Sequence, residues 1–360
     1  MPHRAIAYGD GALRALPGRI GDDRRVLLVT GRDSFDSSGA SDVVEPLRRI
    51  AVVRRWCDFA PNTDAGDLWN GLQVVAEFEA EVIVGIGGGS VMDMAKLLCA
   101  FRGVESEEQL HAAIRAGRSI DVRGVGLILA PTTSGSGSEA THFAVVYIGD
   151  EKFSVAGPAL RPDFTALDPN LAMTGSAHQR ATSGIDAVCQ AIESRWASGA
   201  TRRSQRYAEF ALPVLLANLE PFVVEPDART ARAMQFGSHL SGRAIDISKT
   251  TAAHALAYGI SKRYGVDHGN AVALTLPHFI EVHDDVAPER LNPSVDPAAH
   301  RCAMEFVRAS LDASDGERAR DAFIALLDRI GLPSTMSGVG YQPSDGFEAL
   351  VGSVNVQRLG

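Results

Sequence analysis

The chain has 360 residues, of which 45% are hydrophobic and 22% are charged, and its formal net charge at pH 7 is −9. This length and composition are those of an ordinary globular protein with room for two domains and a sizeable core. The acidic balance argues against nucleic acid or an anionic membrane surface as the main partner. An anionic substrate would need a local basic patch.

No uninterrupted apolar run reaches membrane-spanning length, and the first ten residues, MPHRAIAYGD, lack the basic-then-apolar layout of a signal peptide. The sequence therefore predicts a cytoplasmic protein. Its four cysteines are widely spaced, without a C-x-x-C pair, at Cys57, Cys99, Cys189 and Cys302. This spacing fits a reducing compartment, and we expect all four to be buried small hydrophobic residues.

Short apolar strands alternate with helical patterns in the first half of the chain. Runs rich in Val, Ile and Leu occur at 25–30, 51–56, 81–86 and 125–130. Continuous apolar strands separated by helices predict a mostly parallel sheet with both faces covered. A hairpin is expected where Gly-Asp-Glu separates two further strands, at 143–148 and 152–156.

The pattern changes after Asp168-Pro169. From there, periodic segments rich in Ala, Leu, Glu and Arg predict helices almost throughout, with no convincing strand. The sequence therefore predicts an α/β domain at 1–170 and an all-helical domain at 171–360.

A glycine-rich turn, GIGGGSVMDMAK from Gly85 to Lys96, follows the third apolar strand and leads into a helix. Consecutive glycines let backbone amides approach a pyrophosphate, and a helix N-terminus supplies partial positive charge where the anion lies. We expect Gly88, Gly89 and Ser90 to line the diphosphate of a dinucleotide. The turn has neither the G-x-G-x-x-G pattern nor a G-K-[ST] phosphate loop, so a purely structural turn is the alternative.

A second polar turn, APTTSGSGSEAT from Ala130 to Thr141, follows the fourth apolar strand. Ligands of open α/β sheets bind at the carboxyl ends of the strands, so this turn lies at the same edge as the first. A solvated turn is the alternative, although two such turns at one edge favour a binding site. Four residues offer hydroxyls and amides there: Thr132, Thr133, Ser134 and Ser136.

Four polar residues of the helical half form a pattern typical of a metal site. Asp186 and Gln190 are four residues apart in a segment of good helix formers, so both should project from one helix face. His254 lies in a second helical segment, and His268 follows an expected helix end at Gly265 and approaches from a loop. A carboxylate, an amide oxygen and two imidazoles suit Fe²⁺, Zn²⁺ or Mn²⁺. Core histidines without a metal are the alternative.

Together these motifs resemble those of the iron-containing (group III) alcohol dehydrogenase family, over nearly the whole chain. The matches are G-G-G-S-x-x-D-x-A-K at 87–96, P-T-T-x-G-x-G-S-E at 131–139, G-x-D-A at 184–187, and H-A-L-A and H-G-x-A beginning at His254 and His268. The resemblance implies the fold shared with dehydroquinate synthase: an N-terminal dinucleotide-binding α/β domain, a C-terminal all-helical domain and a metal in the cleft between them. It implies a metal-dependent, NAD(P)H-linked reduction of an aldehyde or ketone.

The resemblance implies that the metal ligands of the family correspond to Asp186, Gln190, His254 and His268 in this chain. The two histidines are also expected to act at the catalytic centre. The family normally has histidine where this chain has Gln190. Because glutamine ligates only weakly, three outcomes stay open: a loosely held metal, a different divalent ion, or a metal bound by three residues plus water or substrate. Tyr258 stands where many members carry a histidine near the nicotinamide. It could donate a proton to the developing alkoxide, in place of water, or pack against the cofactor.

The expected cofactor is NADPH or NADH, together with Fe(II) or Zn(II). After the first apolar strand, many NAD-using relatives have an aspartate for the adenosine 2′-hydroxyl, whereas this chain has Gly31 and Arg32. Without the carboxylate a 2′-phosphate meets no repulsion, and the guanidinium can pair with it. Further cofactor-side positions of the family fall on Asn62, Asp93 and Lys152.

The segment before and after His254 is rich in cationic and hydroxyl groups. Thr250 and Thr251 precede His254 by four and three residues, so they should lie on its helix face one turn back. Lys249 and Lys262 extend the same stripe. Such a patch in an acidic protein favours a substrate with a phosphonate, phosphate or carboxylate group, and solvated helix ends are the alternative.

With glutamine in the ligand set, this segment looks most like the branch of the family that reduces phosphonoacetaldehyde to 2-hydroxyethylphosphonate in phosphonate natural-product biosynthesis. The alternatives are a family dehydrogenase for another anionic or polyol substrate, a dehydroquinate synthase-like lyase, and a non-catalytic dinucleotide-binding relative. Persistent conversion of NADPH to NADP⁺ would separate a dehydrogenase from the lyase. A homodimer is the default oligomer. Relatives usually continue for another helix after N-V-Q-R at 355–358, so a missing or trimmed terminal segment is expected.

Overall fold

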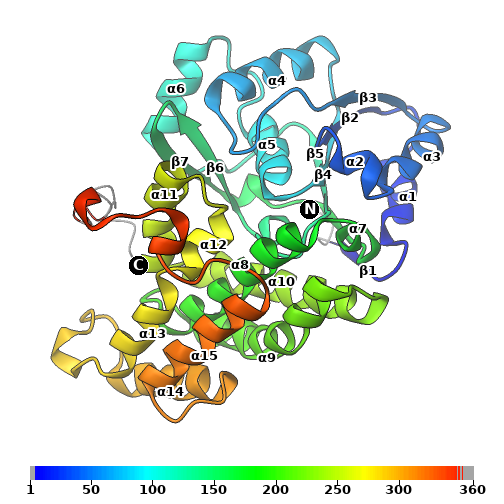
Figure 1. Ribbon diagram of the computed structural model, residues 1–360. Helices are drawn as coiled ribbons and strands as arrows, with labels where there is room; N and C mark the ends of the chain where they lie inside the picture. The colour runs from blue at the N-terminus through cyan, green and yellow to red at the C-terminus, as the bar shows by residue number, and fades with distance from the viewer. Residues whose placement is uncertain (1–4, 347, 349–350, 352–360) are drawn as a thin grey trace. The chain divides into compact units, whose positions relative to one another are not determined.

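The structure, a computed structural model, describes residues 5–346, 348 and 351 (Figure 1). The expected chain end at 355–358 lies outside the described residues. The chain forms two compact units: unit 1 is Met1–Thr133 with Gly137–Gly175, and unit 2 is Ser134–Ser136 with Ser176–Gly360. The domain boundary expected between 170 and 171 stays a prediction.

Unit 1 is built on a six-stranded sheet of parallel strands in the order β1-β8-β5-β4-β2-β3, which confirms the predicted fold class. The four predicted apolar strands are present, each within one residue of the expected ends. The two unpredicted strands, β1 and β8, have only four residues each, too few for a clear pattern. The strands are β1 (Ala5–Tyr8), β2 (Arg25–Thr30), β3 (Val52–Trp56), β4 (Val82–Gly87), β5 (Gly126–Pro131) and β8 (Phe164–Leu167).

Side chains of the central strands alternate between two apolar cores, which explains their continuous apolar sequences. In β2, Leu27 and Val29 belong to the core under α4, α5 and α6, whereas Val26 and Leu28 belong to the core under α1, α2 and α3. These helices lie on the two faces of the sheet (Figure 1). They are α1 (Pro17–Ile20), α2 (Ser34–Ser37), α3 (Val44–Arg48), α4 (Ala65–Glu77), α5 (Gly89–Ala100) and α6 (Glu107–Ala116).

The predicted hairpin is confirmed: β6 (Phe143–Ile148) and β7 (Glu151–Ala156) pair antiparallel. It is attached to α5 by Lys96, whose side chain is completely buried. The Lys96 Nζ donates to Ser138 Oγ and Thr141 Oγ1 at 2.9 Å and to the Phe143 carbonyl at 2.8 Å. A buried ammonium needs this full set of acceptors.

Asp93, one turn earlier on α5, completes the attachment. Its Oδ1 accepts from Ser138 Oγ at 2.5 Å, and its Oδ2 accepts from the Val145 amide at 2.9 Å. Burial raises the pKa of Asp93, although the charge of Lys96 and these hydrogen bonds oppose the rise. Both carboxylate oxygens therefore bond to the protein, and this structural role accounts for Asp93 without the cofactor contact that the sequence suggested, which stays a prediction.

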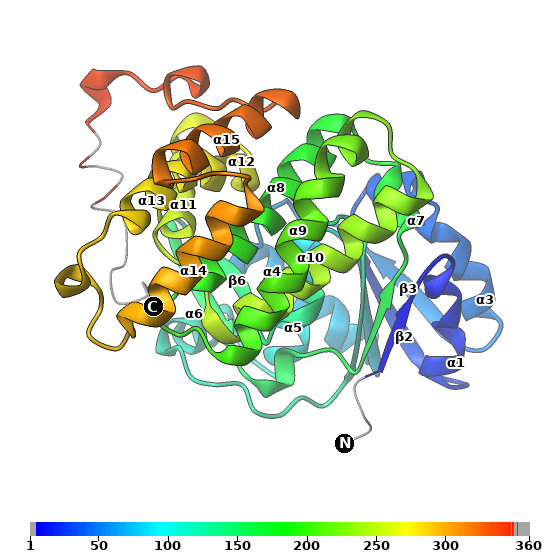
Figure 2. The same cartoon turned by 90° about the horizontal axis from the view of Figure 1, so that it is seen from below.

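Unit 2 is helical, and its described residues include no strand, as predicted. Its central helix is α8, in which every residue from Gly184 to Trp196 is buried. Helices α9 and α10 pack beside it (Figure 2). After the short α7 (Asn170–Met173) of unit 1, the helices are α8 (Ala177–Trp196), α9 (Arg202–Val224), α10 (Ala228–Ser248), α11 (Ala252–Tyr264), α12 (His268–Ala273), α13 (Leu276–Asp284), α14 (Pro297–Ser310) and α15 (Gly316–Arg329).

Among the described residues, α9 alone is long and apolar enough to cross a membrane, judged by length and composition only. Its most apolar 18-residue window is 44% buried, and the helix contacts α8 and α10, so this is weak evidence for a span. The expectation for the cysteines was only half correct. Cys99 and Cys189 are buried, but Cys57, in the loop after β3, is partly exposed and Cys302, on α14, is exposed, because spacing along the chain does not report how a residue is packed.

We expect Lys96→Met to destabilise the protein by about 3–5 kcal/mol, because it leaves the Asp93 carboxylate buried without its cation. Chemical denaturation followed by circular dichroism measures the loss. The double variant D93N/K96M serves as the control and should lose less than K96M alone, since the uncompensated charge is gone. A loss for K96M within about 0.5 kcal/mol, as at surface positions, would contradict the prediction.

Candidate functional site

Three polar side chains lie along one face of the buried helix α8: Asp186, Gln190 and Glu193. They are 6%, 3% and 0% exposed. Their spacing of four and then three residues places them in a row. Polar groups inside a protein must be hydrogen-bonded or paired, so a row of three on a central helix requires partners from other segments.

The row faces two histidines. One ligand atom each from Asp186, His254 and His268 can be chosen so that all three lie within 4.8 Å of one another. The Asp186 Oδ1 is 3.2 Å from His254 Nε2, and the two imidazole centroids are 5.5 Å apart. One carboxylate and two imidazoles are a donor set that fits Fe(II) or Zn(II). The structure therefore brings these three expected ligands together, and Gln190, the fourth, lies beside them with its amide 3.0 Å from Asp186 Oδ2.

His268 does not approach from a loop, as the sequence suggested, but is the first residue of α12. The glycines on either side explain its position. Gly265 ends α11 with a φ of 67°, as expected. A Cβ on Gly269 would lie 1.9 Å from the Thr182 carbonyl of α8, so only glycine lets α12 begin this close to α8. With only six residues and two poor helix formers, Gly269 and Asn270, α12 gave no helical signal in the sequence.

Glu193, which the sequence analysis did not identify, holds His254. Its Oε1 accepts from Thr251 Oγ1 at 2.7 Å and from the Ala253 amide at 3.0 Å, and its Oε2 bonds to His254 Nδ1. Because a carboxylate only accepts, Nδ1 is the protonated nitrogen, and Nε2 is directed at Asp186. An acidic residue seven positions after Asp186, on the same helix face, was the signal available in the sequence.

The charges of this cluster favour a proton on His254. Burial alone would lower the pKa of His254, but Glu193 and Asp186 raise it to about 9. Burial would likewise raise the pKa of Glu193, yet the His254 charge and hydrogen bonds hold it below its usual value. A metal bound by the imidazole replaces a proton, so metal affinity at this site should fall as the pH is lowered.

Gln190 is turned in a way that the sequence did not suggest. Its amide nitrogen, not its oxygen, faces Asp186, with Nε2 donating to Asp186 Oδ2 at 3.0 Å and to the Ser136 carbonyl at 3.3 Å. The amide oxygen, expected to face the metal, lies 3.3 Å from Ser241 Oγ. Sequence spacing fixes the helix face of a residue but not the rotation of its amide.

The residues expected to bind an anion near His254 are arranged differently from the prediction. Helix α11 begins only at Ala252, and Thr251 is its N-cap, so Thr250 and Thr251 are not on the helix face one turn before His254. The hydroxyl of Thr251 bonds to Glu193 and accepts from Trp196 Nε1 at 3.1 Å. Lys249 ends α10 with a φ of 66°, which breaks the helix that the sequence pattern suggested.

On α11, Tyr258 and Lys262 follow His254 at intervals of four residues and so share its side of the helix. Tyr258 is partly exposed and Lys262 is exposed. Their expected roles stay predictions.

In unit 1 the two polar turns meet, as expected. Gly88 is the N-cap of α5, and Gly89 and Ser90 are its first two residues, so their amides belong to the free N-terminal turn of that helix. Thr133 adjoins this turn: a Cβ on Gly88 would be 3.6 Å from its methyl group. The Thr132 amide donates to the Gly87 carbonyl at 3.0 Å.

Two other residues of the cofactor prediction lie near these turns. The backbone amide of Asn62 donates to Ser90 Oγ at 3.1 Å, and Asn62 has a left-handed backbone conformation with a φ of 66°. Burial raises the pKa of Asp93, and Lys152, on β7, is close enough for its charge to oppose that rise. Ser136, by contrast, belongs to unit 2 and gives its carbonyl to Gln190.

The turn after β2 carries the residues expected to select the cofactor. Arg32 is exposed and pairs with exposed Asp58 at 2.9 Å, a contact that water largely screens. Arg55, missed by the sequence analysis, supports the turn by donating to the carbonyls of Gly31 and Arg32 at 3.0 and 2.7 Å. Its position on the neighbouring strand β3 was the only sequence signal.

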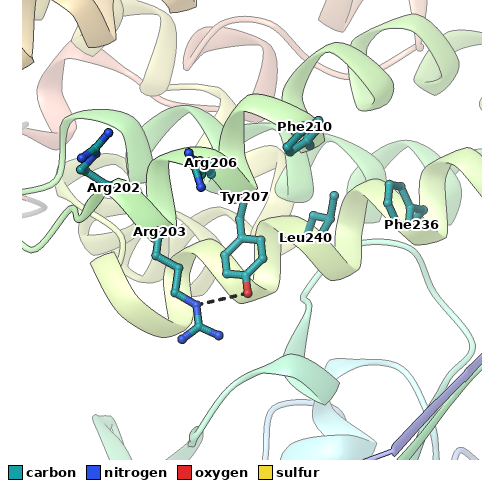
Figure 3. Close-up of a pocket in the computed structure, with 7 residues that line it drawn as sticks. All are labelled: Arg202, Arg203, Arg206, Tyr207, Phe210, Phe236 and Leu240. Atoms are coloured by element: carbon teal, nitrogen blue, oxygen red, sulfur yellow. Dashed lines mark hydrogen bonds between the residues drawn. The ribbon is translucent and has the colours of Figure 1, made fainter.

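A separate groove of about 750 Å³ lies on α9 and α10 (Figure 3). Arg203 and Tyr207 point to the same side there, joined by a hydrogen bond of 3.3 Å. None of the predicted site residues lines this groove, so its volume carries no argument about the metal cluster. Its lining is Arg202, Arg203, Arg206, Tyr207, Phe210, Phe236 and Leu240.

We expect Glu193→Gln to weaken Zn²⁺ binding about 10- to 100-fold, the usual effect of removing a carboxylate that holds a ligand histidine. Glutamine keeps the size of the side chain but replaces one acceptor oxygen with a donor nitrogen. Competition with a chromophoric chelator measures the affinity. Glu220→Gln, in the exposed pair with Arg329, is the control and should bind Zn²⁺ like the parent. Equal affinities for all three proteins would show that Glu193 does not position His254.

Comparison with known proteins identifies the family of this chain. The family model "Iron-containing alcohol dehydrogenase" matches residues 2–169, and "Fe-containing alcohol dehydrogenase family, C-terminal" matches residues 180–358. A phosphonoacetaldehyde reductase of Streptomyces viridochromogenes is 34% identical over 320 residues, 86% of this chain and 76% of the relative. A long-chain-alcohol dehydrogenase of Geobacillus thermodenitrificans is 25% identical over 93% of this chain and 84% of its own.

Solved structures show the same fold. Sulfoacetaldehyde reductase from Bifidobacterium kashiwanohense, solved with NAD⁺, has a TM-score of 0.83 at 24% identity, covering 97% of this chain and 90% of its own. A 1,3-propanediol oxidoreductase has a TM-score of 0.84 at 24% identity, covering 97% and 91%. The chain therefore belongs to the iron-containing alcohol dehydrogenase family and is an NAD(P)-dependent alcohol dehydrogenase of that family.

Proposed function

We propose that the chain reduces phosphonoacetaldehyde to 2-hydroxyethylphosphonate, using NADPH or NADH and Fe(II) or Zn(II). The observation that carries the reductase proposal is the convergence of Asp186, His254 and His268 from three different helices of unit 2. The substrate is supported by the 34% identical relative named phosphonoacetaldehyde reductase. A homodimer in the cytoplasm stays a prediction.

The arrangement of the cluster suits a site that exchanges one of its ligands. Asp186 is buried, His254 is partly exposed and His268 is exposed. A divalent metal held by these three would act as a Lewis acid on the carbonyl oxygen, while the nicotinamide would supply the hydride. Glu193 accepts from the protonated Nδ1 of His254, so Nε2 is the nitrogen that would bind the metal in place of a proton. Tyr258, one turn beyond His254 on α11, would donate a proton to the product oxygen or pack against the cofactor.

The two lysines of the segment before and after His254 would bind the anionic group of the substrate. Lys249 and Lys262 are both exposed, one at the end of α10 and the other one turn beyond Tyr258. A lysine binds phosphonate as a point charge without demanding a fixed geometry. Thr251 is a poorer candidate than the sequence suggested, because its hydroxyl donates to buried Glu193.

The decisive assay follows NADPH oxidation with phosphonoacetaldehyde, comparing metal-stripped protein with protein reloaded with Fe²⁺ or Zn²⁺. We expect turnover to return only with metal, because the carbonyl oxygen needs a Lewis acid, and to be at least tenfold faster than with acetaldehyde at equal concentration. The tenfold margin corresponds to about 1.4 kcal/mol of transition-state binding through the phosphonate. Equal rates with both aldehydes would favour a family dehydrogenase for another substrate. No net NADPH oxidation under any metal would exclude the reductase.

The second proposal within this function is a preference for NADPH. Arg32 stands two residues after the end of β2, the strand is followed directly by Gly31 rather than by a carboxylate, and the pair of Arg32 with Asp58 is exposed enough to exchange for a phosphate. We expect Arg32→Ala to raise the KM for NADPH about tenfold, from loss of one charge-assisted hydrogen bond, with the KM for NADH unchanged. Arg49→Ala, at an exposed arginine of the same unit, is the control. Equal changes for both cofactors would argue against 2′-phosphate recognition.

A further inference from the structure

Gln190 has an amide whose orientation is determined by its neighbours. Its Nε2 lies 3.0 Å from Asp186 Oδ2 and 3.3 Å from the Ser136 carbonyl. Both neighbours are oxygens that carry no hydrogen when Asp186 is ionised, so they can only accept. The group that faces them must therefore be the NH₂.

The other end of the amide is compatible with this orientation but does not determine it. The Gln190 Oε1 lies 3.3 Å from Ser241 Oγ, whose single hydrogen can be donated either to Oε1 or to the Ala187 carbonyl at 2.9 Å. If the amide were reversed, its oxygen would face the Asp186 carboxylate and the Ser136 carbonyl. Both hydrogen bonds would be lost in a place where Gln190 is only 3% exposed and water cannot replace them.

Ser136 is itself held against α8, so the acceptor cannot simply move away. A Cβ on Gly135 would lie 2.4 Å from the Ser183 carbonyl, which shows how closely the 134–136 segment packs on the helix. The Gly135 carbonyl also accepts from Ser238 Oγ of α10 at 3.1 Å. For its oxygen to bind a metal, Gln190 would have to break two buried hydrogen bonds.

We propose that Gln190 is not a metal ligand but a positioning residue for Asp186. Its NH₂ group holds Oδ2, which leaves Oδ1 directed at the histidines, 3.2 Å from His254 Nε2. The metal centre is then built from Asp186, His254 and His268 alone. This inference rests on the proposed function, since it assumes that the cluster binds a divalent metal.

The consequence concerns the class of substrate. Two imidazoles and one carboxylate leave more coordination positions open than four protein ligands do. A substrate with two oxygen functions, a carbonyl and a nearby anionic group, can occupy two such positions, whereas a simple aldehyde occupies one. The replacement of the family's histidine by glutamine thus favours an anionic aldehyde that can bind the metal as a bidentate ligand.

The test uses the full-length protein loaded with Co²⁺, whose visible spectrum depends on the number and type of its ligands. We expect Gln190→Ala to keep one Co²⁺ per chain and the parent's spectrum, while its affinity for the ion falls about 10- to 100-fold because Asp186 is no longer held. We expect Gln190→His to add a ligand, which would change the spectrum and tighten binding. A spectrum changed by Q190A and restored by Q190H would overturn the proposal.

Two further variants serve as a replacement and as a control for Q190A. Gln190→Met fills the same space without a donor, so it replaces Q190A if that variant fails to fold. Ser241→Ala removes the neighbour of Oε1 but leaves the donor side intact, and it should match the parent in spectrum and affinity.

The outcome is separable from that of the proposed function. If the parent binds Co²⁺ but reduces no aldehyde, the reductase proposal fails while the spectra still decide the role of Gln190. If the parent reduces phosphonoacetaldehyde and Q190A changes the spectrum, only the inference about Gln190 fails. A parent that binds no divalent ion would overturn both.

Discussion

The arrangement of unit 2 depends on satisfying the polar face of one buried helix. Asp186, Gln190 and Glu193 on α8 are each less than a tenth exposed, and in such surroundings an unpaired carboxylate or amide is costly. Their partners lie on two other segments, α11 and 134–136. Asp186 meets His254 of α11, Gln190 meets the Ser136 carbonyl, and Glu193 meets the N-terminus of α11. The bonds that satisfy α8 therefore also fix the segments that form the site.

This coupling gives the residues of the site a structural role as well as a chemical one. The carboxylate of Glu193 caps the start of α11 through the Ala253 amide and at the same time sets the protonated nitrogen of His254. Unit 1 uses the same device: buried Lys96 fixes the 138–143 segment with three acceptors, and Asp93 adds the amide of Val145. In both units, buried charged residues beside the predicted sites first of all hold the backbone. A substitution at these positions changes the fold of the site before it changes its chemistry.

Local sequence patterns predicted those features of the fold and site that depend on residues close together in the sequence. Strands β2, β4 and β5 are buried on both faces, so their continuous apolar runs were clear, and the i, i+4 spacing placed Asp186 and Gln190 on one face. Long-range contacts decided the rest. The rotation of the Gln190 amide is set by Ser136, 54 residues away in the chain. Helix α11 starts after Thr251 because Glu193, 58 residues earlier, binds that hydroxyl. No window around either residue contains this information.

The exposure of the three ligands indicates from which side the cluster can be reached. Asp186 is closed in by α8 and by its bond to Gln190, and the far side of His254 is occupied by Glu193. His268 alone is exposed, on a helix whose start is pressed against α8 at Gly269. Protein atoms therefore cover the cluster on the α8 side, and the positions that water or substrate could take lie toward His268. Exchange of water or substrate on a metal held there would leave the hydrogen bonds that hold α8, α11 and the 134–136 segment together unchanged, because none of those bonds involves His268.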